Sequence, residues 1–154
     1  MKMRLSAVLW ISSLMMGSSL ALAADAIPGD LGRLQGCWTA KAGPKHDIAV
    51  TLTIKGGEVE VAIVTPQGIK LAVQGGLKLD ETVMPRSLDW VGMSLLDGQE
   101  LPDHLAIYSV QGDTFTLRNS GPNVGRPREF KPGDGPLNEL LVFTRQKGES
   151  VAVK

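Results

Sequence analysis

The stretch Leu34-Gln35-Gly36-Cys37-Trp38 stands just before a long run of alternating apolar and polar residues. We interpret it as the opening of the first strand of a closed β-barrel. In this interpretation Trp38 is a buried plug at the base, and the rest of the chain forms the wall around it. Strict alternation is typical of strands that bury one face and expose the other.

The alternation is clearest over residues 47–55 and 58–64, which are separated by the hairpin signal Gly56-Gly57. Gly75-Gly76 predicts a bulge or sharp bend inside a longer strand. A turn of helix is expected at residues 31–34, where it would close one end. Further strands are predicted at residues 36–40, 69–79, 87–95, 105–110, 114–118 and 139–146.

About eight strands with short links and no convincing amphipathic helix predict an all-β domain. An antiparallel sheet of this size tends to close on itself, because closure removes its unpaired edges. A two-sheet sandwich fits the same pattern. The even, hairpin-like spacing favours an eight-stranded antiparallel up-and-down barrel.

The first 23 residues have the pattern of a secretory signal peptide. Lys2 and Arg4 precede an apolar run, and Ala21-Leu22-Ala23 is a small-x-small cleavage site. An uncleaved membrane anchor is the other interpretation, but the run is short and interrupted by serines. We therefore predict a secreted or periplasmic protein with no stable membrane span after cleavage. Its parts are a linker at 24–30, a barrel domain at 31–147 and a polar tail at 148–154.

The composition of the chain limits the kinds of partner and chemistry that we expect for this protein. Cleavage leaves 14 of the 16 basic side chains beside 16 acidic ones, so overall charge gives no reason to expect nucleic-acid binding. Cys37 is the only cysteine and cannot form an internal disulfide. We expect it to be a small buried residue rather than a catalytic thiol.

Five segments of the chain, taken together, resemble a small uncharacterised secreted domain that is abundant in planctomycete bacteria. The resemblance covers residues 31–147 and implies a lipocalin-like (calycin-like) barrel, without implying an activity. The segments are Leu34-Gln35-Gly36-Cys37-Trp38, Leu52-Thr53-Ile54-Lys55-Gly56, Ile107-Tyr108-Ser109-Val110-Gln111-Gly112-Asp113-Thr114, Arg126-Pro127-Arg128-Glu129-Phe130 and Leu140-Leu141-Val142-Phe143-Thr144-Arg145.

The start Gly36-x-Trp38 is also similar to the opening strand of lipocalins, in which a basic residue of the last strand packs across the tryptophan. The resemblance implies that Arg145 has this role here, as a cation–π contact at the closed end. We expect Phe130 to dock its segment onto the barrel as a structural clip.

Catalytic and metal-binding patterns are sparse. His46-Asp47 and Asp103-His104 are the only neighbouring histidine–carboxylate pairs, and both are expected at strand ends. Folding could bring the two pairs together as a metal or acid–base site, but polar residues are expected at strand ends in any case, and zinc typically takes three or four protein ligands. We predict no enzyme activity, no metal site and no cofactor, because no set of nucleophile, base and orienting group is visible.

Two functions remain open. A hollow barrel would bind a small lipophilic molecule that enters at the end opposite Trp38; a filled barrel would suit an interaction or inhibitor module for an exported protein. A cavity of several hundred Å³ would favour the first. The candidate ligand-binding residues are Leu52, Ile54, Val61, Ile63, Leu71, Val73, Leu88, Trp90 and Ile107.

Overall fold

The computed structural model describes residues 26–121, 123–133 and 140–148. The predicted signal peptide and most of the predicted tail lie outside these residues. A short helix, α1 (Gly29–Leu34), precedes eight strands. They are β1 (Gly36–Ala42), β2 (Ile48–Lys55), β3 (Glu58–Val64), β4 (Lys70–Asp80), β5 (Arg86–Leu95), β6 (His104–Gln111), β7 (Thr114–Asn119) and β8 (Leu140–Arg145).

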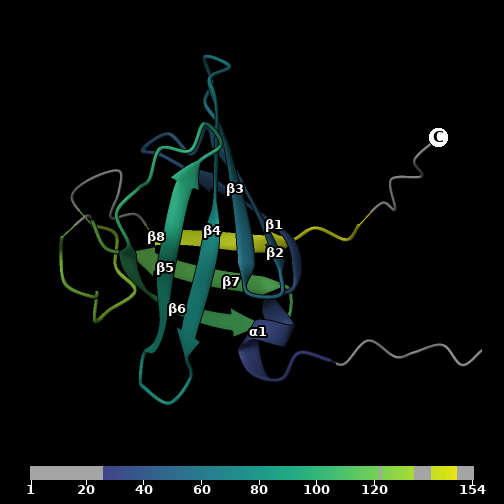
Figure 1. Ribbon diagram of the computed structural model, residues 1–154, viewed down its shortest axis with the longest axis vertical. Helices are drawn as coiled ribbons and strands as arrows, with labels where there is room; N and C mark the ends of the chain where they lie inside the picture. Colours follow the sequence, from purple (N-terminus) through teal and green to yellow (C-terminus); the bar gives the residue numbers. More distant parts are fainter. Residues whose placement is uncertain (1–25, 122, 134–139, 149–154) are drawn as a thin grey trace, which may run out of the picture.

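The strands form a closed barrel in which each one pairs antiparallel with the next, and β8 pairs back with β1 (Figure 1). The predicted eight-stranded up-and-down barrel is therefore confirmed. All predicted strand boundaries lie within two residues of the observed ones. Among the residues that the structure describes, no helix is long and apolar enough to cross a membrane.

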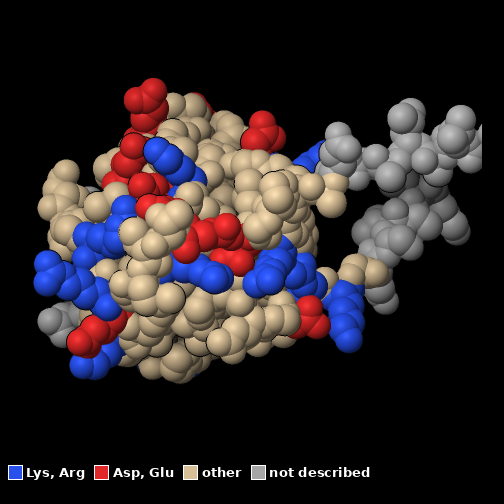
Figure 2. Space-filling model, turned by 90° about the horizontal axis from the view of Figure 1, so that it is seen from below, with Lys and Arg blue, Asp and Glu red and all other residues tan. Residues whose placement is uncertain are grey.

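Alternation places the apolar residues inside, as β2 shows. Val50, Leu52 and Ile54 are buried in the core, whereas Thr53 and Lys55 between and after them are exposed. On the face seen in Figure 2, acidic and basic side chains are interspersed over the surface. This face of the barrel is therefore solvated by charged side chains of both signs, in keeping with the nearly neutral net charge of the chain.

The predicted bend lies in β4, where the pairing with β5 shifts register between Gln74 and Gly76. A Cβ atom on Gly75 would lie 2.4 Å from the Sδ atom and 2.9 Å from the Cα atom of Met93. Glycine is therefore required here by the close approach of β5. The bulge bends the long strand, which a small barrel needs in order to close.

Trp38 plugs one end of the barrel, as predicted. Its side chain is fully buried, its ring packs edge-on against Phe115, and its Nε1 donates to the Leu34 carbonyl oxygen at 2.9 Å. The Arg145 guanidinium carbon lies 4.1 Å from the ring centroid. The same guanidinium donates to the Gln35 carbonyl oxygen at 2.6 Å, which ties β8 to the connection between α1 and β1.

Helix α1 covers the closed end and lies against the end of β6 (Figure 1). It begins at Gly29, so Asp30 belongs to the helix and not to the predicted linker. The Asp30 carboxylate is 3% exposed and accepts from Arg86 at 2.6 Å and from the Tyr108 hydroxyl at 2.9 Å. Burial, reinforced by this carboxylate, raises the pKa of Tyr108 well above its usual value. No local pattern in the sequence indicated this link, because its partners are far apart in the chain.

The segment that includes residues 123–133 is fixed to the outer surface by Arg126. Its guanidinium donates to the Ala106 carbonyl oxygen at 2.7 Å and to the Asp89 carboxylate at 2.6 Å. Phe130, expected to dock this segment, remains 36% exposed. The anchor is therefore the arginine, which satisfies a strand carbonyl and a carboxylate that the outer face presents.

Candidate ligand-binding cavity

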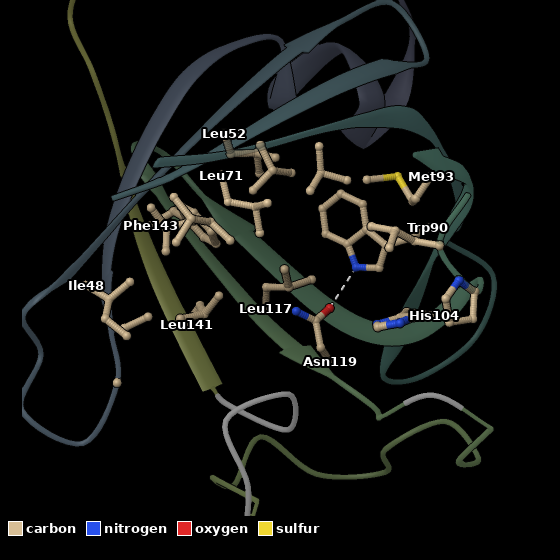
Figure 3. Close-up of a pocket in the computed structure, with 18 residues that line it drawn as sticks. Ile48, Leu52, Leu71, Trp90, Met93, His104, Leu117, Asn119, Leu141 and Phe143 are labelled. Atoms are coloured by element: carbon tan, nitrogen blue, oxygen red, sulfur yellow. Dashed lines mark hydrogen bonds between the residues drawn. The ribbon is translucent and has the colours of Figure 1, made fainter. Parts of the chain in front are cut away.

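The open end of the barrel, opposite Trp38, contains a cavity of about 370 Å³. Its wall is formed by the inner faces of all eight strands (Figure 3). The barrel is therefore hollow at this end, and the filled-barrel premise of the interaction hypothesis does not hold. A cavity of this size is at the lower end of the range for small-molecule sites.

Six of the nine predicted ligand-binding residues line this cavity. They come from four neighbouring strands, β2 to β5, which carry the clearest alternation. The six are Leu52, Val61, Ile63, Leu71, Val73 and Trp90.

Two of the predicted residues belong instead to the packed core. Ile54 is 2% exposed and Leu88 is fully buried, and neither lines the cavity. Both lie on the correct face of their strands, but nearer the closed end, where large side chains fill the interior. Periodicity identifies the face of a strand and says nothing about depth along the barrel.

Ile107 was placed on the wrong face. Its neighbours Ala106 and Tyr108 belong to the buried core cluster, which does not include Ile107. Since side chains alternate along β6, Ile107 points outward. It is nevertheless fully buried, and its cross-strand neighbour Arg118 donates through Nε to the Lys131 carbonyl oxygen. The segment after β7 thus covers an outward apolar residue, whose apolar character in the sequence resembles that of an inward one.

Sequence reasoning missed most of the wall formed by the last strands. Leu117 and Phe143 are almost completely buried and line the cavity, and Met93 joins them from β5. The alternation seen in β2 and β5 also occurs in β7, where Phe115 and Leu117 are buried on the same face. Applying it there would have identified Leu117 as part of this wall.

The mouth of the cavity has an apolar rim. Leu71 on β4 lines the cavity and is 43% exposed at its mouth, and Ile69, two residues earlier in the β3–β4 connection, is 63% exposed. Leu96, directly after β5, is 63% exposed. An apolar molecule approaching the opening therefore meets apolar side chains before it reaches the interior.

Three polar or aromatic side chains interrupt the apolar lining on one side: Trp90, His104 and Asn119. The Trp90 Nε1 donates to Asn119 Oδ1 at 2.7 Å (Figure 3). His104 lines the cavity, whereas His46 lies in the exposed β1–β2 turn, so the two histidine–carboxylate pairs do not form one site. Within the described part of the chain, no group of three His, Cys, Asp or Glu side chains could hold a metal ion.

Comparison with protein-family models, curated proteins and solved structures finds no match to this chain. The half-buried thiol of Cys37 does not line the cavity and lies on the opposite face of β1 from Trp38. The chemistry that the wall offers is apolar contact with one small group of hydrogen-bonding atoms.

Proposed function

We propose that this chain is an exported, lipocalin-like binding protein that takes up one small, largely apolar ligand through the open end of its barrel. The observation that carries the proposal is the cavity of about 370 Å³, lined mainly by aliphatic and aromatic side chains. No charged carboxylate, lysine or arginine lies among its lining residues. Since an unpaired charge is costly to bury, such a wall selects against a ligand whose charged or polar groups would lie among its aliphatic side chains.

The size of the cavity limits the ligand. At the packing density of protein interiors, it accommodates a molecule of roughly 270 Å³, on the order of 10–20 non-hydrogen atoms. A longer chain would extend through the mouth along the apolar rim. Short fatty acids and fused aromatic compounds of two or three rings are suitable probes.

The test is titration with the neutral apolar dye N-phenyl-1-naphthylamine, whose emission rises in an apolar site. Val61 is the position to block, because its cross-strand neighbours Leu52 and Val73 also line the cavity. Leu71 is less suitable: it is 43% exposed at the mouth, so a larger side chain there can turn outward. We expect Val61→Trp to lose dye binding at least tenfold.

The matched control is Glu60→Trp, which adds the same side chain one residue earlier on the exposed outer face. It should bind the dye like wild type. If Val61→Trp is folded and binds the dye as well as the control, the cavity is not the binding site. Binding by neither wild type nor control would remove this proposal and favour a protein partner at the apolar rim.

Export is tested separately. N-terminal sequencing of the protein released by its own host should begin at Ala24, after the small-x-small site. A chain that still begins at Met1 would contradict the exported part of the proposal.

A further inference from the structure

The polar atoms of the cavity wall gather on one side, on three consecutive strands. Trp90 on β5 lies directly opposite His104 on β6. Asn119 on β7 lies opposite Ala106, two residues further along β6 than His104. Side chains in such direct and diagonal positions on one face of a sheet are neighbours. Figure 3 shows Trp90, His104 and Asn119 together at one side, away from Leu52 and Phe143. We call these three residues the polar corner.

The hydrogen bond within the polar corner fixes the orientation of the Asn119 carboxamide group, that is, which of its two terminal atoms is oxygen and which is nitrogen. The indole Nε1–H of Trp90 can only donate, so the carboxamide atom 2.7 Å from it must be the oxygen Oδ1. The Nδ2 group of Asn119, with its two donors, then occupies the other position. No protein group among the residues that the structure describes accepts a hydrogen bond from this Nδ2, or pairs with the imidazole of His104.

The polar corner therefore presents donors to the cavity. Asn119 offers Nδ2, and the imidazole of His104 donates through at least one ring nitrogen. Both side chains are half-buried, so an apolar ligand that displaced water from them would leave these donors unsatisfied. A ligand that carries an acceptor at this point avoids that cost.

We propose that the polar corner binds an oxygen acceptor, a carboxylate or carbonyl, at one end of an otherwise apolar ligand. This inference rests on the proposed function, because it assigns the orientation of a ligand inside the same cavity. The head group would lie against Asn119 and His104, and the apolar body would extend towards Leu52 and Phe143. The predicted ligand class is thus medium-chain fatty acids and apolar ketones or esters.

The experiment compares two probes with the same alkyl chain and opposite heads, decanoic acid and decylamine, by displacement of N-phenyl-1-naphthylamine. The carboxylate accepts hydrogen bonds, whereas the ammonium can only donate. We expect wild type to prefer decanoate by about tenfold or more, as a hydrogen bond to a charged group typically provides.

Two variants of Asn119 test the assignment. Asn119→Leu removes the donors and should abolish most of the preference. Asn119→Asp keeps an acceptor for Trp90 but replaces Nδ2 by oxygen, so the preference should reverse towards decylamine. Thr116→Leu, on the outer face of β7, is the matched control and should behave like wild type.

The outcomes separate this inference from the function on which it rests. If wild type binds neither the dye nor the probes, both fail. If wild type binds the dye but shows no preference between the heads, or if Asn119→Asp keeps the wild-type preference, only the polar corner is refuted. Should Asn119→Leu not fold, Asn119→Asp decides the question, since it retains the bond to Trp90.

Discussion

Replacing Trp38 by alanine tests whether the closed end holds the barrel together. The indole is fully buried and packs on Phe115, and it donates to the carbonyl oxygen of Leu34, the last residue of α1. The substitution therefore removes core contacts and leaves a buried acceptor without its donor. Both effects act at the point where helix and barrel meet.

Truncation of a buried tryptophan costs about 3–5 kcal/mol of unfolding free energy. Small domains have only about 5–15 kcal/mol in total. For a domain of this size the loss corresponds to a melting temperature roughly 10–20 °C lower than that of wild type.

The measurement is thermal and urea unfolding of the mature protein followed by circular dichroism. Val142→Ala is the control, because Val142 is 54% exposed on β8 and a surface truncation typically changes stability by no more than about 0.5 kcal/mol. A Trp38→Ala protein that melts within a few degrees of wild type would refute the plug.

The contact between Trp38 and Arg145 can be isolated by a double-mutant cycle. Trp38→Leu keeps apolar bulk without the aromatic face, and Arg145→Met keeps most of the stem without the charge. We expect the two changes to be non-additive by about 0.5–2 kcal/mol, the usual size of a cation–π pair. Strict additivity would mean that Arg145 acts only through its bonds to the Gln35 and Arg33 carbonyl oxygens and to the Asp113 carboxylate.

Three further predictions concern residues outside the cavity. Tyr108 is the only tyrosine, and its folded pKa is raised above the unfolded value of about 10, so the stability it contributes is complete below pH 10 and is lost as pH rises further. Its tyrosinate absorbance should therefore appear only together with alkaline unfolding. Gly75→Ala should cost about 1–3 kcal/mol in urea unfolding, because its methyl group would meet the backbone of Met93, whereas Gly57→Ala, with open space around it, should change little. Arg126→Ala should release the outer segment, so limited proteolysis should cut that segment faster while the barrel remains folded.

The fold could be predicted from the sequence because its signals are local. Alternation over β2 and β3 fixes which face is buried, and Gly75-Gly76 marks the bend. The position of Trp38 at the base was interpreted from the opening stretch and its contact with Arg145 was implied by a resemblance, and the structure confirms both. The Asp30 link was missed because it joins α1 to β5 and β6, and only the folded barrel brings those segments together.

The cavity could be predicted only in part, for two physical reasons. A residue's depth along the barrel depends on the stagger of the strands, so Ile54 and Leu88 were assigned to the cavity when they belong to the packed core. The identity of the inner face is ambiguous in a strand whose outer side is also covered, as Ile107 shows. Asn119 lies at the end of β7 and carries no apolar signal, so periodicity could not indicate it.

Whether an eight-stranded barrel is hollow depends on the sizes of side chains that meet at the same level, and these come from every strand. At the closed end the level is filled by large rings, those of Trp38, Tyr108, Phe115 and Phe143, of which Phe115 packs against each of the other three. Towards the mouth, β3 and β4 contribute mostly branched aliphatic residues that are too short to meet across the interior. The aromatic end can supply the stability of the domain while the aliphatic end remains open, since stability need not be uniform along a structure. A ligand that binds the open end of the folded state alone should then raise the melting temperature by mass action, and substitutions of closed-end residues that do not line the cavity, such as Trp38, should leave its affinity unchanged.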